Sequence, residues 1–132
     1  MGLKVRVTQN RSFSRMVHLI GRLDNDTVGV LDAELKQITQ QQVDVVVFEL
    51  EHLEYISSAG LRSIFAVQKL MASRDGRIVL MNAQPPVRKV FEIVQATELS
   101  EVFSSVAELD RYLDTMQYKV RHSLSDSKPS DT

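Results

Sequence analysis

A short apolar stretch in the middle of the chain constrains the fold more than any other feature. Its apolar residues are mostly β-branched and barely alternate with polar ones: Val43, Val45, Val46, Val47, Phe48 and Leu50. Such a stretch is typical of a central strand that is covered on both faces. Because strands of this kind belong to parallel sheets packed against helices, the stretch favours an α/β protein.

The residues before this strand predict a hairpin and a helix. Val5–Thr8 alternates apolar and polar residues, Met16–Gly21 reads as a second strand, and Asn10–Ser12 supplies a turn between them. Asp24–Thr27 then offers several helix N-caps. The helix that follows has apolar residues at helical spacing: Leu31, Leu35 and Ile38.

The residues after the central strand predict a further alternation of helices and strands. A long helical pattern starts near Ser57 and ends at the turn Asp75–Gly76, and Arg77–Asn82 reads as another buried strand. Pro85–Pro86 starts a third helix, since proline is tolerated in a first turn. The remaining expectations are the inner face of that helix (Val87, Val90, Phe91, Val94), a short last strand (Val102–Phe103) and a final helix (Val106, Leu109, Leu113, Met116).

We therefore predict a single α/β domain with a mixed, mostly parallel sheet of about four to five strands and about four helices. The length of 132 residues suits one domain. The first two strands would form an antiparallel hairpin at one side of the sheet, and right-handed crossovers would join the later, parallel strands. The domain would span residues 1–118. The polar tail 119–132 has too few hydrophobic residues to pack, and we expect it to be disordered.

The composition excludes several classes of function. The chain has no cysteine, so disulfides, thiolate metal sites and thiol catalysis are ruled out. Sixteen basic residues stand against seventeen acidic ones, which argues against a nucleic-acid partner. No apolar run approaches the ~20 residues that span a bilayer, and the N-terminus lacks a signal-peptide core, so we expect a cytoplasmic protein with no membrane partner. Since His18, His52 and His122 have no metal-ligand spacing, we expect neither a metal nor a cofactor.

The junction between the central strand and the next helix is the candidate site. In open α/β sheets, function tends to lie where a strand ends and the next helix begins. Ser57 and Ser58 stand at this junction, where serines can satisfy unpaired backbone N–H groups. The helix end also carries partial positive charge, so a serine there is expected to be accessible and suited to hold a phosphoryl group. The residues alone leave two interpretations open, simple capping and regulation by phosphorylation.

The run from Phe48 to Arg62, FELEHLEYISSAGLR, resembles the signature of STAS domains, and specifically of bacterial anti-sigma factor antagonists. The pattern of that family is a hydrophobic strand, an acidic or polar loop, and then Asp-Ser-Ser-Gly-Leu opening a helix. The resemblance covers about residues 4–117. It includes Gly21–Asp24 before the first helix, and Gly76–Asn82 followed by the helix Val87–Val94. It implies a STAS-like fold for the whole domain.

The resemblance also implies a partner switch. In the family, an anti-sigma factor that is also a serine kinase of the GHKL type phosphorylates the motif serine. The unphosphorylated antagonist binds this kinase, and a serine phosphatase of the PP2C type restores the binding form. Carried over by position, Ser58 is the phosphoacceptor and Gly60 the close-packing residue beside it. Ser57 stands where the family usually has aspartate, and Ala59 replaces the second serine.

The helix after Ser58 predicts a docking face. Its broad apolar face, which would cover the sheet, holds Leu61, Ile64, Phe65, Val67, Met71 and Ala72. The opposite side holds Ala59, Ala66 and Leu70 with Ser63, flanked by Arg62 and Lys69. An outer apolar stripe beside the acceptor serine suits a partner, although scattered exposed hydrophobic residues are also normal. We assign partner docking to Arg62, Ser63, Ala66, Lys69 and Leu70.

Other functions fit the residues less well, and we expect no enzyme and no catalytic residue. A hydrolase with Ser58 as nucleophile lacks the Gly-x-Ser-x-Gly elbow, since Ile56 stands two residues earlier, and no histidine follows until His122. The sequence has neither a Gly-rich phosphate loop nor a Walker lysine, so it does not indicate a nucleotide site. The acidic residues near the junction match no metal motif: Glu49, Glu51 and Glu54. The alternative that stays open is a STAS domain that serves as a fixed adaptor in a multiprotein or transport complex, without phosphorylation.

Overall fold

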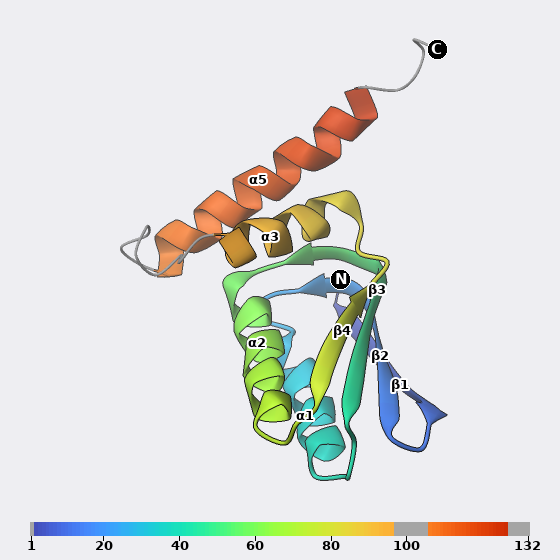
Figure 1. The fold of residues 1–132 in the computed structure, drawn as a ribbon. Helices are drawn as coiled ribbons and strands as arrows, with labels where there is room; N and C mark the ends of the chain where they lie inside the picture. The colour runs from blue at the N-terminus through green and yellow to red at the C-terminus, as the bar shows by residue number, and fades with distance from the viewer. Residues whose placement is uncertain (1, 97–105, 127–132) are drawn as a thin grey trace.

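Four strands and four helices make up the parts of the chain that the computed structural model describes, residues 2–96 and 106–126. In chain order they are β1 (Leu3–Arg11), β2 (Ser14–Leu23), α1 (Val28–Thr39), β3 (Val45–Ile56), α2 (Ser58–Ala72), β4 (Arg77–Met81), α3 (Pro85–Ala96) and α5 (Val106–Asp126) (Figure 1). The strands form one sheet in the order β1-β2-β3-β4. β1 pairs antiparallel with β2 and the other pairs are parallel, which confirms the predicted α/β fold with its N-terminal hairpin.

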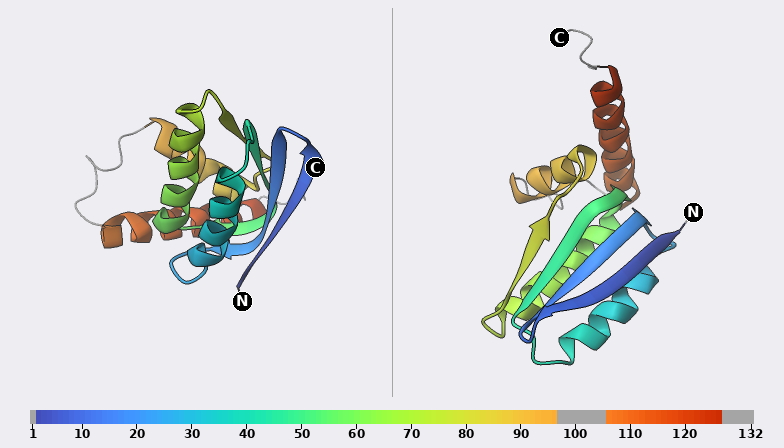
Figure 2. Two further views of the ribbon diagram at one scale, coloured as in Figure 1. Left: turned by 90° about the horizontal axis from the view of Figure 1, so that it is seen from below. Right: turned by 90° about the vertical axis from the view of Figure 1, so that its right-hand side faces the viewer.

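The helices form two groups around this sheet. α1 and α2 lie side by side against one face, whereas α3 and α5 lie beyond the end at which the parallel strands finish (Figures 1 and 2). The crossovers from β2 to β3 and from β3 to β4 step in the same direction, and right-handed crossovers of this kind place their helices on the same face. Neither crossover helix therefore covers the second face of β3, contrary to the expectation for a central strand.

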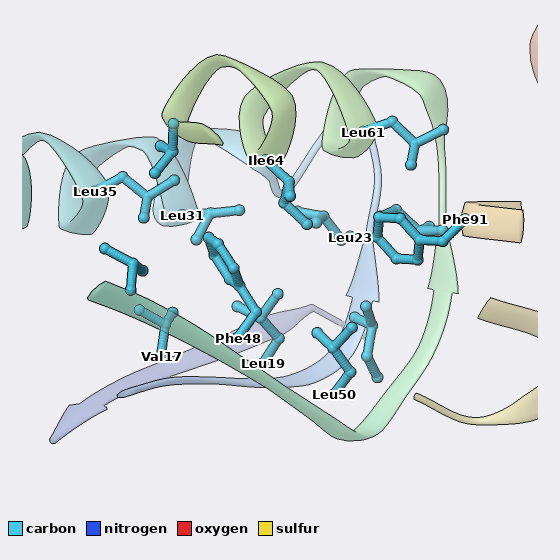
Figure 3. Packing of buried hydrophobic residues seen from close by; sticks show 14 of the residues in the cluster. Val17, Leu19, Leu23, Leu31, Leu35, Phe48, Leu50, Leu61, Ile64 and Phe91 are labelled. Atoms are coloured by element: carbon cyan, nitrogen blue, oxygen red, sulfur yellow. The ribbon is translucent and has the colours of Figure 1, made fainter. Parts of the chain in front are cut away.

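The main core lies between the sheet and the pair α1 and α2. Figure 3 shows side chains from both layers that point toward one another: Val17, Leu19, Leu31, Leu35, Phe48, Leu50 and Ile64. All seven are buried, and burying one such side chain contributes roughly 1.5–3 kcal/mol. This layer accordingly holds β2, β3, α1 and α2 together as one unit.

α5 is longer than the sequence indicated. The predicted inner residues do face the core, since Leu113 is fully buried and Leu109 and Met116 pack against the buried cluster. However, the helix continues to Asp126, so the boundary expected after residue 118 falls inside it, and the expected disorder does not hold for residues 119–126. In this part of the helix Arg121 donates to the backbone carbonyl of Glu54 in β3, a polar contact that a search for apolar periodicity does not detect. Residues 127–132 and the predicted strand Val102–Phe103 lie outside the described residues.

β3 extends past its neighbour β4. It pairs with β4 only over Val45–Glu49, whereas its pairing with β2 continues to Ile56. The second half of β3 thus has no strand on its β4 side in the described parts of the chain. Side chains bind backbone groups there instead, and the first is Gln84, whose Nε2 donates to the carbonyl of Glu51 at 2.8 Å. The other side chains that bind the backbone of β3 there come from α5, and they hold this helix beside the end of β3.

Within residues 2–96 and 106–126, no helix combines the length and the apolar character needed to cross a membrane.

Candidate functional site

The junction between β3 and α2 is a tight turn in which Ser57 is the N-cap. β3 ends at Ile56, α2 begins at Ser58, and Ser57 between them has extended backbone (φ −100°, ψ 177°). The Ser57 hydroxyl accepts a hydrogen bond from the N–H of Gly60 at 3.5 Å, and the Ser57 N–H donates to the carbonyl of Leu23 at 2.9 Å. Of the two serines, Ser57 is therefore the one that caps α2, and it ties the turn to the end of β2.

Ser58 is buried rather than accessible. The residue is 2% exposed, and its buried Oγ has no hydrogen-bond partner within the described residues. The Ser58 backbone N–H is already engaged, because it donates to Oδ1 of Asp110 on α5 at 2.9 Å. The prediction of an accessible serine at a free helix end is thus wrong. It took no account of α5, which meets the N-terminus of α2 through Asp110.

One face of α5 lies along the junction and the end of β3. Gln117 is 3% exposed, and its Oε1 accepts the N–H of Ile56 at 3.0 Å while its Nε2 donates to the carbonyl of Ile56 at 2.8 Å. Arg121 donates to the carbonyl of Glu54 at 2.5 Å. Together with the bond from Ser58 to Asp110, these contacts place α5 antiparallel to the segment that ends β3. The side chain of Gln117 occupies the backbone groups that a neighbouring strand would otherwise pair.

Gly60 allows α2 to approach β2 closely. A Cβ atom added to Gly60 would lie 2.6 and 2.8 Å from two side-chain carbons of Leu23 and 3.0 Å from one of Ile56. Only glycine fits this position without displacing its neighbours. Ala59, which we placed on the outer stripe, is instead 7% exposed and counts among the buried apolar residues. The predicted inner residue Ala72 is exposed, since it lies in the last turn of α2.

The predicted docking residues lie along a groove between α1 and α2. The α2 side of the groove is lined by Ala59, Arg62, Ser63, Ala66, Val67 and Leu70. Lys69 is exposed but is not part of this lining. Ser63 is committed to the fold, because its Oγ donates to Oδ1 of Asp32 on α1 at 2.7 Å. Leu70 is 37% exposed and gives the groove an exposed apolar side chain.

A second hollow, beside Ser57, is lined by charges of both signs. Four carboxylates face two guanidinium groups in it: Asp24, Asp26, Asp110, Asp114, Arg22 and Arg111. Arg22 lies 4.0 Å above the ring of Tyr55, and its Nε is 3.7 Å from Oδ2 of Asp24. Burial, with a further contribution from the carboxylate of Asp114, raises the pKa of Tyr55 to about 12. Tyr55 is therefore neutral and joins β3 to α5.

The histidines and the acidic residues near the junction have local contacts. His18 Nε2 lies 3.3 Å from the hydroxyl of Thr8, and the His122 ring lies 3.9 Å from that of Tyr118, centroid to centroid. His52 approaches Glu51 at 3.9 Å. Glu49 accepts the N–H of Glu51 and the side-chain amide of Asn82, each at 2.6 Å. The residues described contain no group of three or more His, Asp or Glu arranged to hold a metal ion.

The residues of α5 that meet the junction were not predicted from the sequence. Asp110, Gln117 and Arg121 share one face of the helix, since they are about two turns and then one turn apart. That spacing was readable in the sequence as a polar stripe next to the apolar one. Nothing in the stripe itself, however, indicates which backbone groups it binds.

Comparison with known proteins identifies the family of this chain. Residues 4–109 match the STAS domain. BtrV, a candidate anti-sigma factor antagonist of Bordetella bronchiseptica, is 40% identical over 75 residues, which span 57% of this chain and 65% of BtrV. The anti-sigma F factor antagonist of Paenibacillus polymyxa is 23% identical over 106 residues, 80% of this chain and 90% of that protein.

Solved structures give the same result. The anti-sigma factor antagonist SpoIIAA in its unphosphorylated form matches with a TM-score of 0.64 and 25% identity, over 70% of this chain and 81% of SpoIIAA. The phosphorylated form of Bacillus SpoIIAA matches with a TM-score of 0.60 and 24% identity, over 69% and 83% of the two chains. Since the family pattern covers most of the sequence and the fold agrees, the chain belongs to the STAS domain family.

Proposed function

We propose that this chain is a partner switch of the anti-sigma factor antagonist type, with Ser58 as its phosphoacceptor. Unphosphorylated, it binds a serine kinase of the GHKL type that also serves as an anti-sigma factor. The kinase transfers the γ-phosphoryl group of ATP to the Ser58 oxygen, ADP and the hydroxyl proton leave, and the chain is released. A PP2C-type phosphatase hydrolyses the ester with water, which returns the hydroxyl and inorganic phosphate. The chain itself acts in the cytoplasm as a binding protein and catalyses no reaction.

The observation that carries this proposal is the unpartnered hydroxyl of Ser58. Ser57 supplies the helix cap, and the Oγ of Ser58 makes no hydrogen bond within the described residues although it is buried. A buried hydroxyl without a partner costs on the order of 1–3 kcal/mol. Such a group calls for an explanation other than fold stability, and chemical modification of the oxygen supplies one.

Relatives support the same role. BtrV and the P. polymyxa protein carry names of anti-sigma factor antagonists, and SpoIIAA has been solved in both an unphosphorylated and a phosphorylated form. A partner that binds unphosphorylated Ser58 would also meet the groove between α1 and α2, because Ala59, the next residue, lines that groove. Arg62 and Leu70 would then supply a charged and an apolar contact.

Phosphorylation weakens such a contact through charge. A phosphoserine carries about −1.5 to −2 charges at neutral pH and three acceptor oxygens. A partner packed over the start of α2 must desolvate that charge or lose the contact. A loss of ~3 kcal/mol lowers the affinity by roughly two decades, which is enough to exchange partners.

The first test asks whether the chain is phosphorylated, and where. The chain is expressed in its native host and its intact mass is measured, with Ser58→Ala and Ser57→Ala as matched variants. We expect a fraction of the wild-type chain and of Ser57→Ala to gain the mass of one phosphate, and Ser58→Ala to gain none. A phosphate that persists in Ser58→Ala would place the modification elsewhere.

The second test measures binding of the kinase that performs this modification. We expect Ser58→Ala to bind it in the presence of ATP without release, and Ser58→Asp to bind it weakly. Leu70→Asp, in the groove, should also weaken binding. Phe13→Ser, which alters an exposed phenylalanine (47% exposed) next to the start of β2, should leave binding unchanged. Equal binding of Ser58→Ala and Ser58→Asp would contradict the regulatory role.

The burial of Ser58 favours a second candidate, a fixed STAS adaptor in a multiprotein or transport complex. An adaptor needs the groove between α1 and α2 but no access to the Ser58 oxygen, which is buried. The mass measurement separates the two functions. An adaptor carries no phosphate in the native host under any growth condition, and its binding is indifferent to Ser58→Asp.

A further inference from the structure

We propose that α5 is a removable cover over Ser58, and that the carboxylate of Asp110 holds the Ser58 amide in the place of a phosphate. This inference rests on the proposed function for its biological meaning, since a cover regulates the site only if Ser58 is the phosphoacceptor. The cover itself is a property of the fold and can be measured without a kinase.

The contacts of α5 are concentrated on the segment that leads into the site. The helix binds the backbone at Glu54, Ile56 and Ser58 through Arg121, Gln117 and Asp110. Gln117 uses both ends of its amide on the same residue, Ile56. A kinase that reaches the Ser58 oxygen has to separate these groups, so α5 must move away from the junction before the phosphoryl transfer.

The polar character of these contacts makes the cover removable. Leu113 anchors the middle of α5 in the core, and Leu109 and Met116 pack against the core. The contacts of Asp110, Gln117 and Arg121 with the backbone at the junction, however, are hydrogen bonds, which water can replace when the helix lifts. The net contribution of such bonds is modest, so local opening of α5 costs less than global unfolding. The helix can therefore expose Ser58 while the sheet and α1 stay folded.

Asp110 links the cover to the phosphorylation state. Its Oδ1 accepts the Ser58 N–H at 2.9 Å at the start of α2, where the helix dipole favours a negative charge. A phosphate on Ser58 would compete with the Asp110 carboxylate for the same N–H group. Its charge would add to the four carboxylates of the hollow beside Ser57, which already outnumber the guanidinium groups of Arg22 and Arg111. The phosphate and these carboxylates carry charge of the same sign and repel one another, so the phosphorylated chain favours the lifted helix.

The two events are thermodynamically linked. If phosphorylation favours the lifted position of α5, then lifting α5 must favour phosphorylation by the same factor at equilibrium. A protein or condition that removes α5 from the junction would thus sensitise the chain to its kinase. The closed helix, conversely, protects the unphosphorylated chain.

A thiol placed at the site tests the cover directly. The chain contains no cysteine, so Ser58→Cys introduces the single thiol, and its rate of reaction with Ellman's reagent reports how often the site is exposed. We expect the thiol in the native chain to react on the order of tenfold or more slowly than in urea. Asp110→Ala or Gln117→Ala, added to Ser58→Cys, should raise the rate in the native chain by on the order of tenfold. The control Lys119→Ala alters an exposed residue of the same helix and should leave the rate unchanged.

A second measurement guards against a variant that unfolds. Amide hydrogen exchange in the intact chain monitors the N–H groups of Ile56 and Ser58, which Gln117 and Asp110 bind, beside core amides such as that of Phe48 in β3. Ser58→Asp should speed exchange at Ile56 and Ser58 while Phe48 stays protected. A rate of thiol reaction equal to that in urea, or an unchanged rate in both α5 variants, would overturn the cover.

The two proposals can fail separately. A protected thiol that Asp110→Ala exposes, in a chain that never gains phosphate in its native host, leaves the cover in place and overturns the phosphoacceptor role. A freely reactive thiol in a chain that is phosphorylated at Ser58 overturns the cover and leaves the partner switch.

Discussion

Ser57 and Ser58 are chemically identical neighbours that the fold treats differently. The hydroxyl of Ser57 accepts the N–H of Gly60 and caps α2, whereas that of Ser58 makes no hydrogen bond within the described residues. The sequence showed two serines at a helix start, but the choice between them depends on backbone angles. Extended backbone at Ser57 points its oxygen back toward the first turn, and no residue type dictates which of two serines takes that conformation.

This difference predicts opposite effects of two alanine substitutions on stability. Ser57→Ala should lower the free energy of unfolding by about 1 kcal/mol, as the loss of a cap does. Ser58→Ala should leave it unchanged or raise it slightly, because it removes a buried hydroxyl without a partner. Urea unfolding of the two variants beside the wild type checks the pair. A loss in Ser58→Ala as large as that in Ser57→Ala would show that the Ser58 hydroxyl has a partner.

At the scale of elements, the contact between α2 and the ends of β2 and β3 decides where the junction lies. α2 can approach because Gly60 has no side chain, and Leu23 and Ile56 fill the space in which a Cβ atom would stand. The resemblance to STAS domains indicated a close-packing glycine here, and the structure supplies the two side chains against which it packs.

We predict that Gly60→Ala destabilises the chain and shifts the start of α2. The added Cβ would stand 2.6 Å from a carbon of Leu23, and overpacking of this kind costs roughly 1–3 kcal/mol. Gly29→Ala in α1 is a matched control, since nothing lies within 4 Å of its Cβ position and alanine is the better helix former by roughly 0.5–1 kcal/mol. The melting temperature should therefore fall in Gly60→Ala and rise in Gly29→Ala. A melting temperature that falls equally in both variants would contradict the close contact at Gly60.

α5 shows where prediction of an element stops. Apolar residues at helical spacing correctly placed a helix at Leu109, Leu113 and Met116. Its position beside the junction involves hydrogen bonds to the backbone of β3 and to the first residue of α2. The backbone of β3 is free to form these bonds because β4 pairs with β3 only as far as Glu49. The residues of α5 do not indicate how long β4 is.

At the scale of the whole molecule, most of the fold could be predicted from the sequence, but the position of α3 and α5 could not. The hairpin, the parallel strands and the crossover helices follow from alternation, β-branched runs and turn residues, because local patterns dictate them. The grouping of α3 and α5 beyond the strand ends, seen in Figure 2, depends on contacts between distant segments. Ser58 does lie at the junction between β3 and α2, where the sequence pattern put it, but its burial under α5 follows from this long-range arrangement.

Tyr55 links these layers, and it gives the molecule a predicted dependence on pH. Its ring lies under Arg22 of β2, and it is hydrogen-bonded to Asp114 of α5. Burial first, and the carboxylate of Asp114 second, raise its pKa to about 12, whereas an unfolded tyrosine titrates near 10. Between about pH 10 and about pH 12 the unfolded chain has lost a proton that the folded chain keeps, so the stability due to the neutral phenol is complete below about pH 10 and falls as the pH rises further.

We therefore expect the urea midpoint of the wild type to fall more steeply than that of Tyr55→Phe from about pH 10 upward. The two chains differ only at position 55, so the difference between the two profiles isolates Tyr55. Tyrosinate absorbance provides a direct reading, since the component that titrates last in the native chain should be missing from Tyr55→Phe. Parallel stability profiles in the two chains would mean that Tyr55 is open to water, and that α5 does not close over the end of β3 as the contacts of Gln117 and Asp110 require.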